Sequence, residues 1–374
     1  MSIASRLRCV IVQAGFWLCL LHSCLGAPAA GAPPYRTQNI ILITTDGFRW
    51  QEVFRGAEEA LLTTNYVPKN LERLKKQFWR ESPAERREAL LPFFWNVIAR
   101  QGQLWGNTNL GSIVRVANPH KFSYPGYNEL LTGLADPRID SNDKNPNPNT
   151  NVLEWLDSKP GFRGRCAAFA SWDVMAFILN RERNGLFVRA GIEPLALGRL
   201  SPRQQLLNEL VRDTTPLWDD LMHDGLLYHG AIDYLQQQRP RVLYVAFDET
   251  DDWAHDGRYD RYLQAAHRVD ECARRLWETV QSLPAYRGKT TLLLTADHGR
   301  GSGPKWKEHG KDVEGAEYIW LAALGPDIPP LGERQSTAPI WQKQIAATLA
   351  ASLQQDFHAA FPETGSVISG LLSK

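Results

Sequence analysis

The sequence predicts an α/β fold with a mostly parallel central sheet and helices on both faces. Continuous apolar, β-branched runs, the pattern of strands buried on both faces, alternate along the chain with capped or amphipathic helical segments. The chain has 374 residues, 43% of them hydrophobic and 22% charged, which is enough apolar material for one large core. Because no repeat, coiled coil or clear linker interrupts this alternation, we expect a single domain over residues 36–374.

The first half of the chain supplies two strands and two helices. Residues 39–45 form a continuous apolar run, which predicts a buried strand. Ser82-Pro83-Ala84-Glu85 is a capping box with proline at the first helical position, and it predicts a helix that runs to about Arg100. A strand at 112–117 and a helical segment at 127–131 follow.

The second half begins with a loop at 136–151, where Asp, Asn and Pro dominate, and a loop this long in a compact domain is often functional. Beyond it the pattern predicts helices at 152–157, between 202 and 238 and at 259–283. Strands are predicted at 166–171, 242–247, 290–295 and 319–324.

Charge balance excludes two classes of partner. Lys and Arg number 42 and Asp and Glu 41, so the formal charge is +1. Broad binding to nucleic acid or to anionic lipid requires clustered excess positive charge. We therefore expect no nucleic-acid-binding patch, and a small molecule as the partner.

The N-terminus has the pattern of a signal peptide. Arg6 and Arg8 precede an apolar stretch at 9–21, and small residues follow as far as Ala32. We expect residues 1–30 to direct export to the periplasm or the medium, with no transmembrane helix in the mature chain, because no later apolar run approaches about 20 residues. An uncleaved membrane anchor and lipidation at Cys24 are the alternatives; His22 makes the lipidation motif a poor match.

Export would leave two cysteines in the mature chain, Cys166 and Cys272. They could form one disulfide in an oxidising compartment, and nothing in the sequence brings them together. They are too few and too far apart for a cysteine-based metal site.

Acidic residues follow three of the predicted strands. Asp46 ends the first, the segment 248–252 follows the strand at 242–247, and Asp297-His298 follows the strand at 290–295. A single Asp after a strand commonly caps the next turn. Three such ends, however, converge on one crevice beyond the carboxyl ends of a parallel sheet.

Histidines complete a predicted metal site. Asp251 and His255 are four apart, so they share one face of a helical turn, and Asp297 and His298 reach one ion from a tight turn at Gly299. His309 precedes a further glycine. Aspartate and histidine ligands favour Zn²⁺, with Mn²⁺ or another divalent ion as a substitute. The remaining histidines of the mature chain have no such context: His120, His223, His229, His267 and His358.

Five motifs, in order, resemble the nucleotide pyrophosphatase/phosphodiesterase branch of the alkaline phosphatase superfamily. They span residues 39–310, most of the mature chain, and are Asp46-Gly47-Phe48-Arg49, Phe122-Ser123-Tyr124-Pro125-Gly126-Tyr127 with Leu131-Thr132-Gly133, Glu249-Thr250-Asp251 with His255, Thr295-Ala296-Asp297-His298-Gly299, and His309-Gly310. The resemblance implies an alkaline phosphatase-like sandwich and a hydrolase of phosphate esters, a phosphodiesterase or a phosphomonoesterase.

The resemblance also assigns roles to residues. It implies two divalent ions, one held by Asp251, His255 and His309, and the other by Asp46, Asp297, His298 and Ser123. Ser123 would be the nucleophile that forms a phosphoserine, and Asn142 or Asn145 would contact the phosphate.

Departures from the branch leave alternatives open. Ser123 replaces the usual threonine and Gly126 the usual asparagine. Ser123-x-Pro125 also resembles the sulfatase signature, although Tyr127 stands where that signature has arginine. A sulfatase-like hydrolase of the same fold and a non-catalytic, metal-stabilised binding protein are therefore the alternatives.

Overall fold

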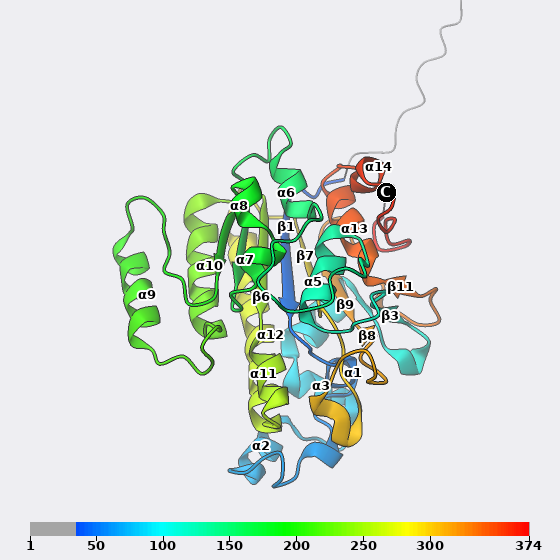
Figure 1. Ribbon diagram of the computed structural model, residues 1–374. Helices are drawn as coiled ribbons and strands as arrows, with labels where there is room; N and C mark the ends of the chain where they lie inside the picture. The colour runs from blue at the N-terminus through cyan, green and yellow to red at the C-terminus, as the bar shows by residue number, and fades with distance from the viewer. Residues whose placement is uncertain (1–34, 374) are drawn as a thin grey trace, which may run out of the picture. The chain divides into compact units, whose positions relative to one another are not determined.

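The computed structural model describes residues 35–373, and an eight-stranded sheet in the order β10-β2-β9-β7-β1-β6-β4-β5 lies at its centre (Figure 1). All neighbouring strands pair in parallel except β9, which is antiparallel to both β7 and β2. The mostly parallel sheet predicted from the sequence is confirmed. The strands are β1 (Asn39–Thr45), β2 (Gln103–Trp105), β4 (Cys166–Ala170), β5 (Phe187–Ala190), β6 (Val242–Phe247), β7 (Thr290–Thr295), β9 (Leu321–Leu324) and β10 (Gly332–Glu333).

A smaller sheet corrects two predicted strands. It contains β11 (Ile340–Trp341), β3 (Val114–Arg115) and β8 (Tyr318–Ile319) in that order. The predicted strand at 112–117 is therefore reduced to β3. The predicted strand at 319–324 is wrong as one element, because its residues divide between β8 and β9 in different sheets. The division falls at Trp320, whose buried indole donates to the backbone oxygen of Phe48 at 2.9 Å.

Helices flank the central sheet in two packed groups, α10 with α9 and α12, and α5 with α6, α7 and α13 (Figure 1). Among the described residues, no helix combines the length and apolar character needed to cross a membrane. The helices are α1 (Trp50–Arg55), α2 (Leu71–Phe78), α3 (Pro83–Leu90), α4 (Ala99–Gln101), α5 (Ser123–Thr132), α6 (Val152–Asp157), α7 (Met175–Ile178), α8 (Arg181–Asn184), α9 (Pro202–Asp213), α10 (Asp224–Gln238), α11 (Glu249–His255), α12 (Tyr259–Ser282), α13 (Ile345–Ser352) and α14 (Phe357–Ala360).

The helix predicted from Ser82 to Arg100 begins as expected but is not continuous. The Ser82 hydroxyl accepts the backbone N–H of Glu85 at 3.2 Å and caps α3. α3 ends at Leu90 because Pro92 has no N–H to donate and its ring clashes with the preceding turn. A π-helical turn (Phe94–Ile98) and α4 follow. The two N–H groups freed at the break, at residues 93 and 94, donate to the Asp270 carboxylate of α12.

Strand register places the acidic strand ends together. β1 lies between β6 and β7, with Thr45 opposite Phe247 and Thr44 opposite Thr295. The carboxyl ends of all three strands therefore meet at one edge of the sheet. In open α/β sheets, ligand sites form in the crevice beyond this edge.

The two described cysteines do not form a disulfide. Cys166 in β4 and Cys272 in α12 are both buried and free.

The predicted signal peptide, residues 1–30, lies outside the described residues.

Candidate metal centre

The six predicted metal ligands lie together at the carboxyl edge of the sheet. Asp46 directly follows β1, and Asp297 and His298 follow β7 after one intervening residue, Ala296. Asp251 and His255 lie on α11, the short helix after β6, and His309 lies on the loop after a 3₁₀ turn at 303–307. The ligands therefore lie close together because the sheet aligns the carboxyl ends of the strands that they follow.

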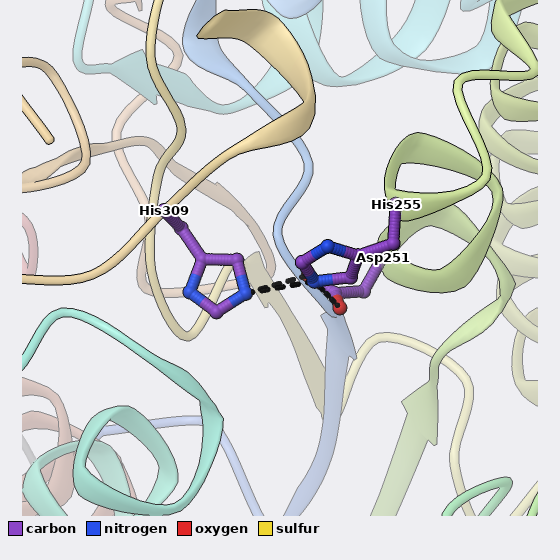
Figure 2. Close-up of side chains that lie close together, drawn as sticks. All are labelled: Asp251, His255 and His309. Atoms are coloured by element: carbon purple, nitrogen blue, oxygen red, sulfur yellow. Dashed lines mark hydrogen bonds and ion pairs between the residues drawn. The ribbon is translucent and has the colours of Figure 1, made fainter.

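Asp251, His255 and His309 form the first group of possible metal ligands. Figure 2 shows their side chains pointing toward one another, two from α11 and one from the facing loop. The Nε2 atoms of the two histidines are 2.9 Å apart, and the Nε2 of His255 is 3.0 Å from Asp251 Oδ2. The four-residue spacing on α11 produces the carboxylate–imidazole pair, as the sequence predicts.

Asp46, Asp251 and His298 form a second group, with Asp251 shared between the two. His298 Nε2 lies 3.2 Å from Asp46 Oδ1 and 3.4 Å from Asp297 Oδ2. The other ring nitrogen, Nδ1, is 2.9 Å from the backbone oxygen of Gly299, and this contact aims Nε2 at the carboxylates. Gly299 itself is needed for space, because a Cβ there would lie 2.2 Å from the Tyr318 backbone oxygen.

Ser123 is the first residue of α5 and faces the second group. Its Oγ is 3.5 Å from Asp46 Oδ1 and 3.5 Å from His298 Nε2. The N-cap position belongs to Phe122, so the serine hydroxyl is not occupied in capping the helix. Gly126, one turn later, would place a Cβ 2.5 Å from the Asp297 backbone oxygen. Glycine at this position therefore lets α5 approach the loop after β7.

The two asparagines that the sequence leaves as equivalent candidates line different cavities. Asn142 accepts the backbone N–H of Tyr124 at 3.0 Å and lines a cavity of about 180 Å³ together with Ser123 and Asp46. Asn145 lines a different cavity, and its backbone oxygen accepts the Tyr124 hydroxyl at 2.6 Å. Only Asn142 lines the cavity that contains the serine.

Sequence reasoning missed Arg300, which follows the Asp-His-Gly motif directly. Its side chain is buried, and Nη2 donates to the Asp251 carboxylate and, at 3.1 Å, to the Asp251 backbone oxygen. Nη1 donates to the backbone oxygen of Lys307. The adjacency to the motif was the available signal, but the direction of the side chain depends on how the loop folds back over α11.

The electrostatics of the centre fit divalent cations. Burial, then the charge of the neighbouring aspartates, raises the pKa of Asp46 and of Asp297 well above the usual value. Asp297 Oδ2 is buried and has no hydrogen-bond donor. Burial, followed by the charge of His298, lowers the pKa of His309 to about 2, so its imidazole is neutral and can act as a ligand. A buried carboxylate without a donor, beside the neutral imidazole of His309, is the donor set that a divalent ion satisfies.

The five histidines without context in the sequence are in neither group of possible ligands within the described residues. His267, for example, directs Nδ1 to the backbone oxygen of Leu90 at 2.7 Å.

Comparison with known proteins finds one matching family model over part of the chain. Residues 217–320 match the family model of the Metalloenzyme superfamily, and this segment contains all the predicted ligands except Asp46 and Ser123. No curated protein sequence is significantly similar to the chain.

Solved structures share the fold at low sequence identity. Alkaline phosphatase PafA is 10% identical with a TM-score of 0.57, and the match covers 91% of this chain and 100% of that one. Murine ectonucleotide pyrophosphatase/phosphodiesterase 5, an inactive form in complex with AMP, is 14% identical with a TM-score of 0.52 over 90% and 100% of the two chains. A 2-O GAG sulfatase is 13% identical with a TM-score of 0.53 over 90% and 74%. The predicted resemblance is confirmed at the level of the superfamily fold.

Proposed function

We propose that this chain, which has the fold of the alkaline phosphatase superfamily and matches the Metalloenzyme superfamily over residues 217–320, is a metal-dependent hydrolase of phosphate esters. One observation supports the proposal above all. Ser123, Asn142 and the carboxylates of Asp46 and Asp251 line a single cavity at the carboxyl edge of the sheet. A nucleophile, a hydrogen-bond donor and metal ligands thus face the same space.

We infer two metal positions from the ligand groups. Asp251, His255 and His309 would hold one divalent ion; Asp46, Asp297, His298 and the Ser123 oxygen would hold the other. The aspartate and histidine donors favour Zn²⁺, and Mn²⁺ is the substitute. When bound, such a pair lowers the pKa of a coordinated hydroxyl and stabilises the charge on the attacking and leaving oxygens of an in-line displacement.

Ser123 would begin the reaction. Its oxygen attacks phosphorus, the bond from phosphorus to the alcohol oxygen breaks, and the alcohol leaves with a proton. Water then attacks the phosphoserine, which releases phosphate from a monoester, or a phosphomonoester from a diester, and returns the proton to Ser123.

The protein positions the phosphoryl group through Asn142 and α5. The carbonyl oxygen of the Asn142 amide accepts the Tyr124 N–H, so its NH₂ group is the part available to a phosphate oxygen. Ser123 is the first residue of a ten-residue helix, and helix N-termini favour negative charge. Both features stabilise an anionic ester next to the serine.

A panel of aryl phosphate monoesters, aryl phosphate diesters and aryl sulfates, run on metal-replete protein, tests the proposal. We expect turnover of at least one phosphate ester, loss of turnover on chelation and recovery when Zn²⁺ or Mn²⁺ is returned. Faster turnover of the sulfates would favour the sulfatase alternative. Stoichiometric metal with no turnover of any ester would favour the non-catalytic binding protein.

We further propose that the chain is exported, on the basis of the signal-like pattern at residues 1–30. N-terminal sequencing of protein from the periplasm or the medium should find a first residue between Cys24 and Gly31. A sequence that began at Ser2 would contradict export by cleavage.

A further inference from the structure

Glu129 is a buried acid that the proposed reaction does not use. It lies on α5, the helix that begins at Ser123, and its side chain is fully buried. It does not line the cavity that contains the serine. Burying a carboxylate is costly unless its oxygens are hydrogen-bonded, so the partners of this group indicate what it does.

Both oxygens of Glu129 accept hydrogen bonds from the segment that leads into Ser123. Oε1 accepts the backbone N–H of Ala117 at 2.8 Å, and Oε2 accepts the backbone N–H of Asn118 at 2.8 Å. The Asn118 side chain donates to the same Oε2 at 2.9 Å through Nδ2. Burial raises the pKa of Glu129, and these N–H donors act in the opposite direction. The carboxylate therefore fixes the backbone upstream of the nucleophile by accepting from it.

Asn118 extends this contact as far as Lys121. Its Oδ1 accepts the backbone N–H of Lys121 at 2.8 Å and that of His120 at 3.2 Å. Lys121 has a φ of 56°, a left-handed conformation that non-glycine residues rarely adopt. Strained backbone of this kind persists only when surrounding contacts hold it. Glu129 and Asn118 therefore set the backbone from which the chain enters α5.

Lys121 links the same segment to a proposed metal ligand. Its backbone oxygen accepts the N–H of Gly310 at 3.0 Å, and Gly310 directly follows His309. The Nδ1 of His309 is buried and has no hydrogen-bond partner. Since no hydrogen bond through Nδ1 orients this ring, the position of the imidazole depends on the backbone of its loop.

A further contact of Glu129 leads to Asp297. Oε1 accepts the backbone N–H of Lys343 at 3.1 Å. The neighbouring side chain, Gln342, is buried, and its Nε2 donates to the backbone oxygen of Asp297 at 2.6 Å. One carboxylate on α5 thus connects the segment before the nucleophile to two loops that carry proposed metal ligands.

We propose that Glu129 is a positioning residue for this centre, whose carboxylate fixes Ser123, His309 and Asp297 relative to one another without touching substrate or metal. The inference rests on the proposed function, which gives those three residues their roles. A displacement of about 1 Å at a reacting group can cost about 100-fold in rate, and partners that hold metal ligands contribute about 10–100-fold to activity or metal affinity. A buried acid with a purely structural role would change stability alone.

The test replaces the acid with its amide. Glu129→Gln keeps the shape of the side chain but places an NH₂ group among N–H donors. We expect kcat on the best aryl phosphate to fall by about 10–100-fold while KM stays within about threefold of the wild-type value. We also expect one of the two Zn²⁺ equivalents to bind about tenfold more weakly in dialysis against a chelator.

Asp327→Asn is the matched control. Asp327 is also buried, and its Oδ2 accepts the backbone N–H of Thr37 at 2.8 Å. Thr37 precedes the amino end of β1, whereas Asp46 follows the carboxyl end, so this acid holds backbone at the opposite edge of the sheet. The control variant should lower Tm but leave kcat, KM and Zn²⁺ content unchanged.

Asn118→Ala is the second variant, because it breaks the link between Glu129 and Lys121. The two substitutions together should lower kcat by little more than either alone, since both act on one chain of contacts. The proposal would be overturned if both single variants kept wild-type kcat and Zn²⁺ content, or if Asp327→Asn lowered kcat as much. If Glu129→Gln does not fold, kcat and Zn²⁺ content of Asn118→Ala decide in the same way.

A failure of the proposed function would be distinguishable. If the wild-type protein hydrolyses no ester, hydrogen exchange of the peptides that contain Ser123 and His309 still tests Glu129. Exchange that is faster by about tenfold or more in Glu129→Gln at both peptides, with β6 unchanged, would support the positioning role. Unchanged exchange at the His309 peptide would exclude it.

Discussion

Replacing Ser123 with alanine should abolish turnover and leave the fold almost unchanged. The Oγ contacts to Asp46 and His298 are both 3.5 Å long, at the outer limit of hydrogen bonding. Bonds this long contribute less than about 1 kcal/mol each to the free energy of unfolding. Because Phe122 occupies the N-cap position, no helix cap is lost either. We therefore expect Tm to fall by no more than about 2–4 °C.

The activity should respond on a different scale. If Ser123 is the nucleophile, its removal deletes the first chemical step, and only positioning and electrostatic stabilisation remain. We expect kcat to fall by about 10³-fold or more, which corresponds to at least about 4 kcal/mol in activation free energy. The expected increase in activation free energy is thus several times the expected decrease in the free energy of unfolding.

The assay combines the initial rate on the best aryl phosphate, metal content by elemental analysis and thermal unfolding. Ser123→Thr is the matched control, because it keeps a hydroxyl at the position and should retain measurable turnover. Ser141→Ala, on the loop near the cavity, controls for loss of a serine as such. A Ser123→Ala enzyme that kept about a third of the wild-type rate with its metals bound would refute the nucleophile assignment. A trapped phosphopeptide containing Ser123 would support it.

Three further predictions concern the metals and the packing of α5. His255→Ala should lose about one equivalent of metal by elemental analysis, whereas His267→Ala should lose none. Burial raises the pKa of Asp46 and Asp297 above the unfolded value, so the folded metal-free protein binds more protons than the unfolded chain. The Tm of the metal-free protein should therefore fall as pH rises from about 5 to about 8. The Tm of the metal-loaded protein should not fall, so the difference between the two Tm values should widen. Gly126→Ala should destabilise the fold by about 1–3 kcal/mol in denaturant titrations and lower kcat, because its Cβ would meet a backbone oxygen at 2.5 Å.

Each of these has its own control or contrary result. Full metal content in His255→Ala would remove that residue from the ligand set. Parallel pH profiles of Tm for the two forms would show that proton release is not linked to metal binding. Gly225→Ala is the control for the glycine variant, since a Cβ at this α10 position meets nothing within 4 Å and should be neutral or slightly stabilising.

The sequence alone determined the elements that local pattern specifies. The strands β1, β6 and β7 lie where the apolar runs predict them, at 39–45, 242–247 and 290–295. Buried parallel strands need continuous apolar, β-branched residues, so the local sequence predicts where these strands begin and end. The four-residue spacing of Asp251 and His255 is likewise a local property, realised on α11.

Local pattern failed where a distant residue decides the conformation. The helix predicted as far as Arg100 breaks after Leu90, and Asp270 of α12 accepts the two N–H groups that the break releases. The strand at 319–324 divides because the two halves find partners in different sheets. Neither partner is adjacent in sequence, so neither outcome could be derived from the segment itself.

Only the tertiary structure decided which side chains share the cavity. Asn142 and Asn145 are equivalent in the sequence, and the fold of their loop alone places the first beside Ser123. Arg300 became part of the centre through a loop that folds back over α11. The physical reason is that the position of a side chain in a site depends on long-range packing of backbone, which periodicity and spacing along the chain do not encode.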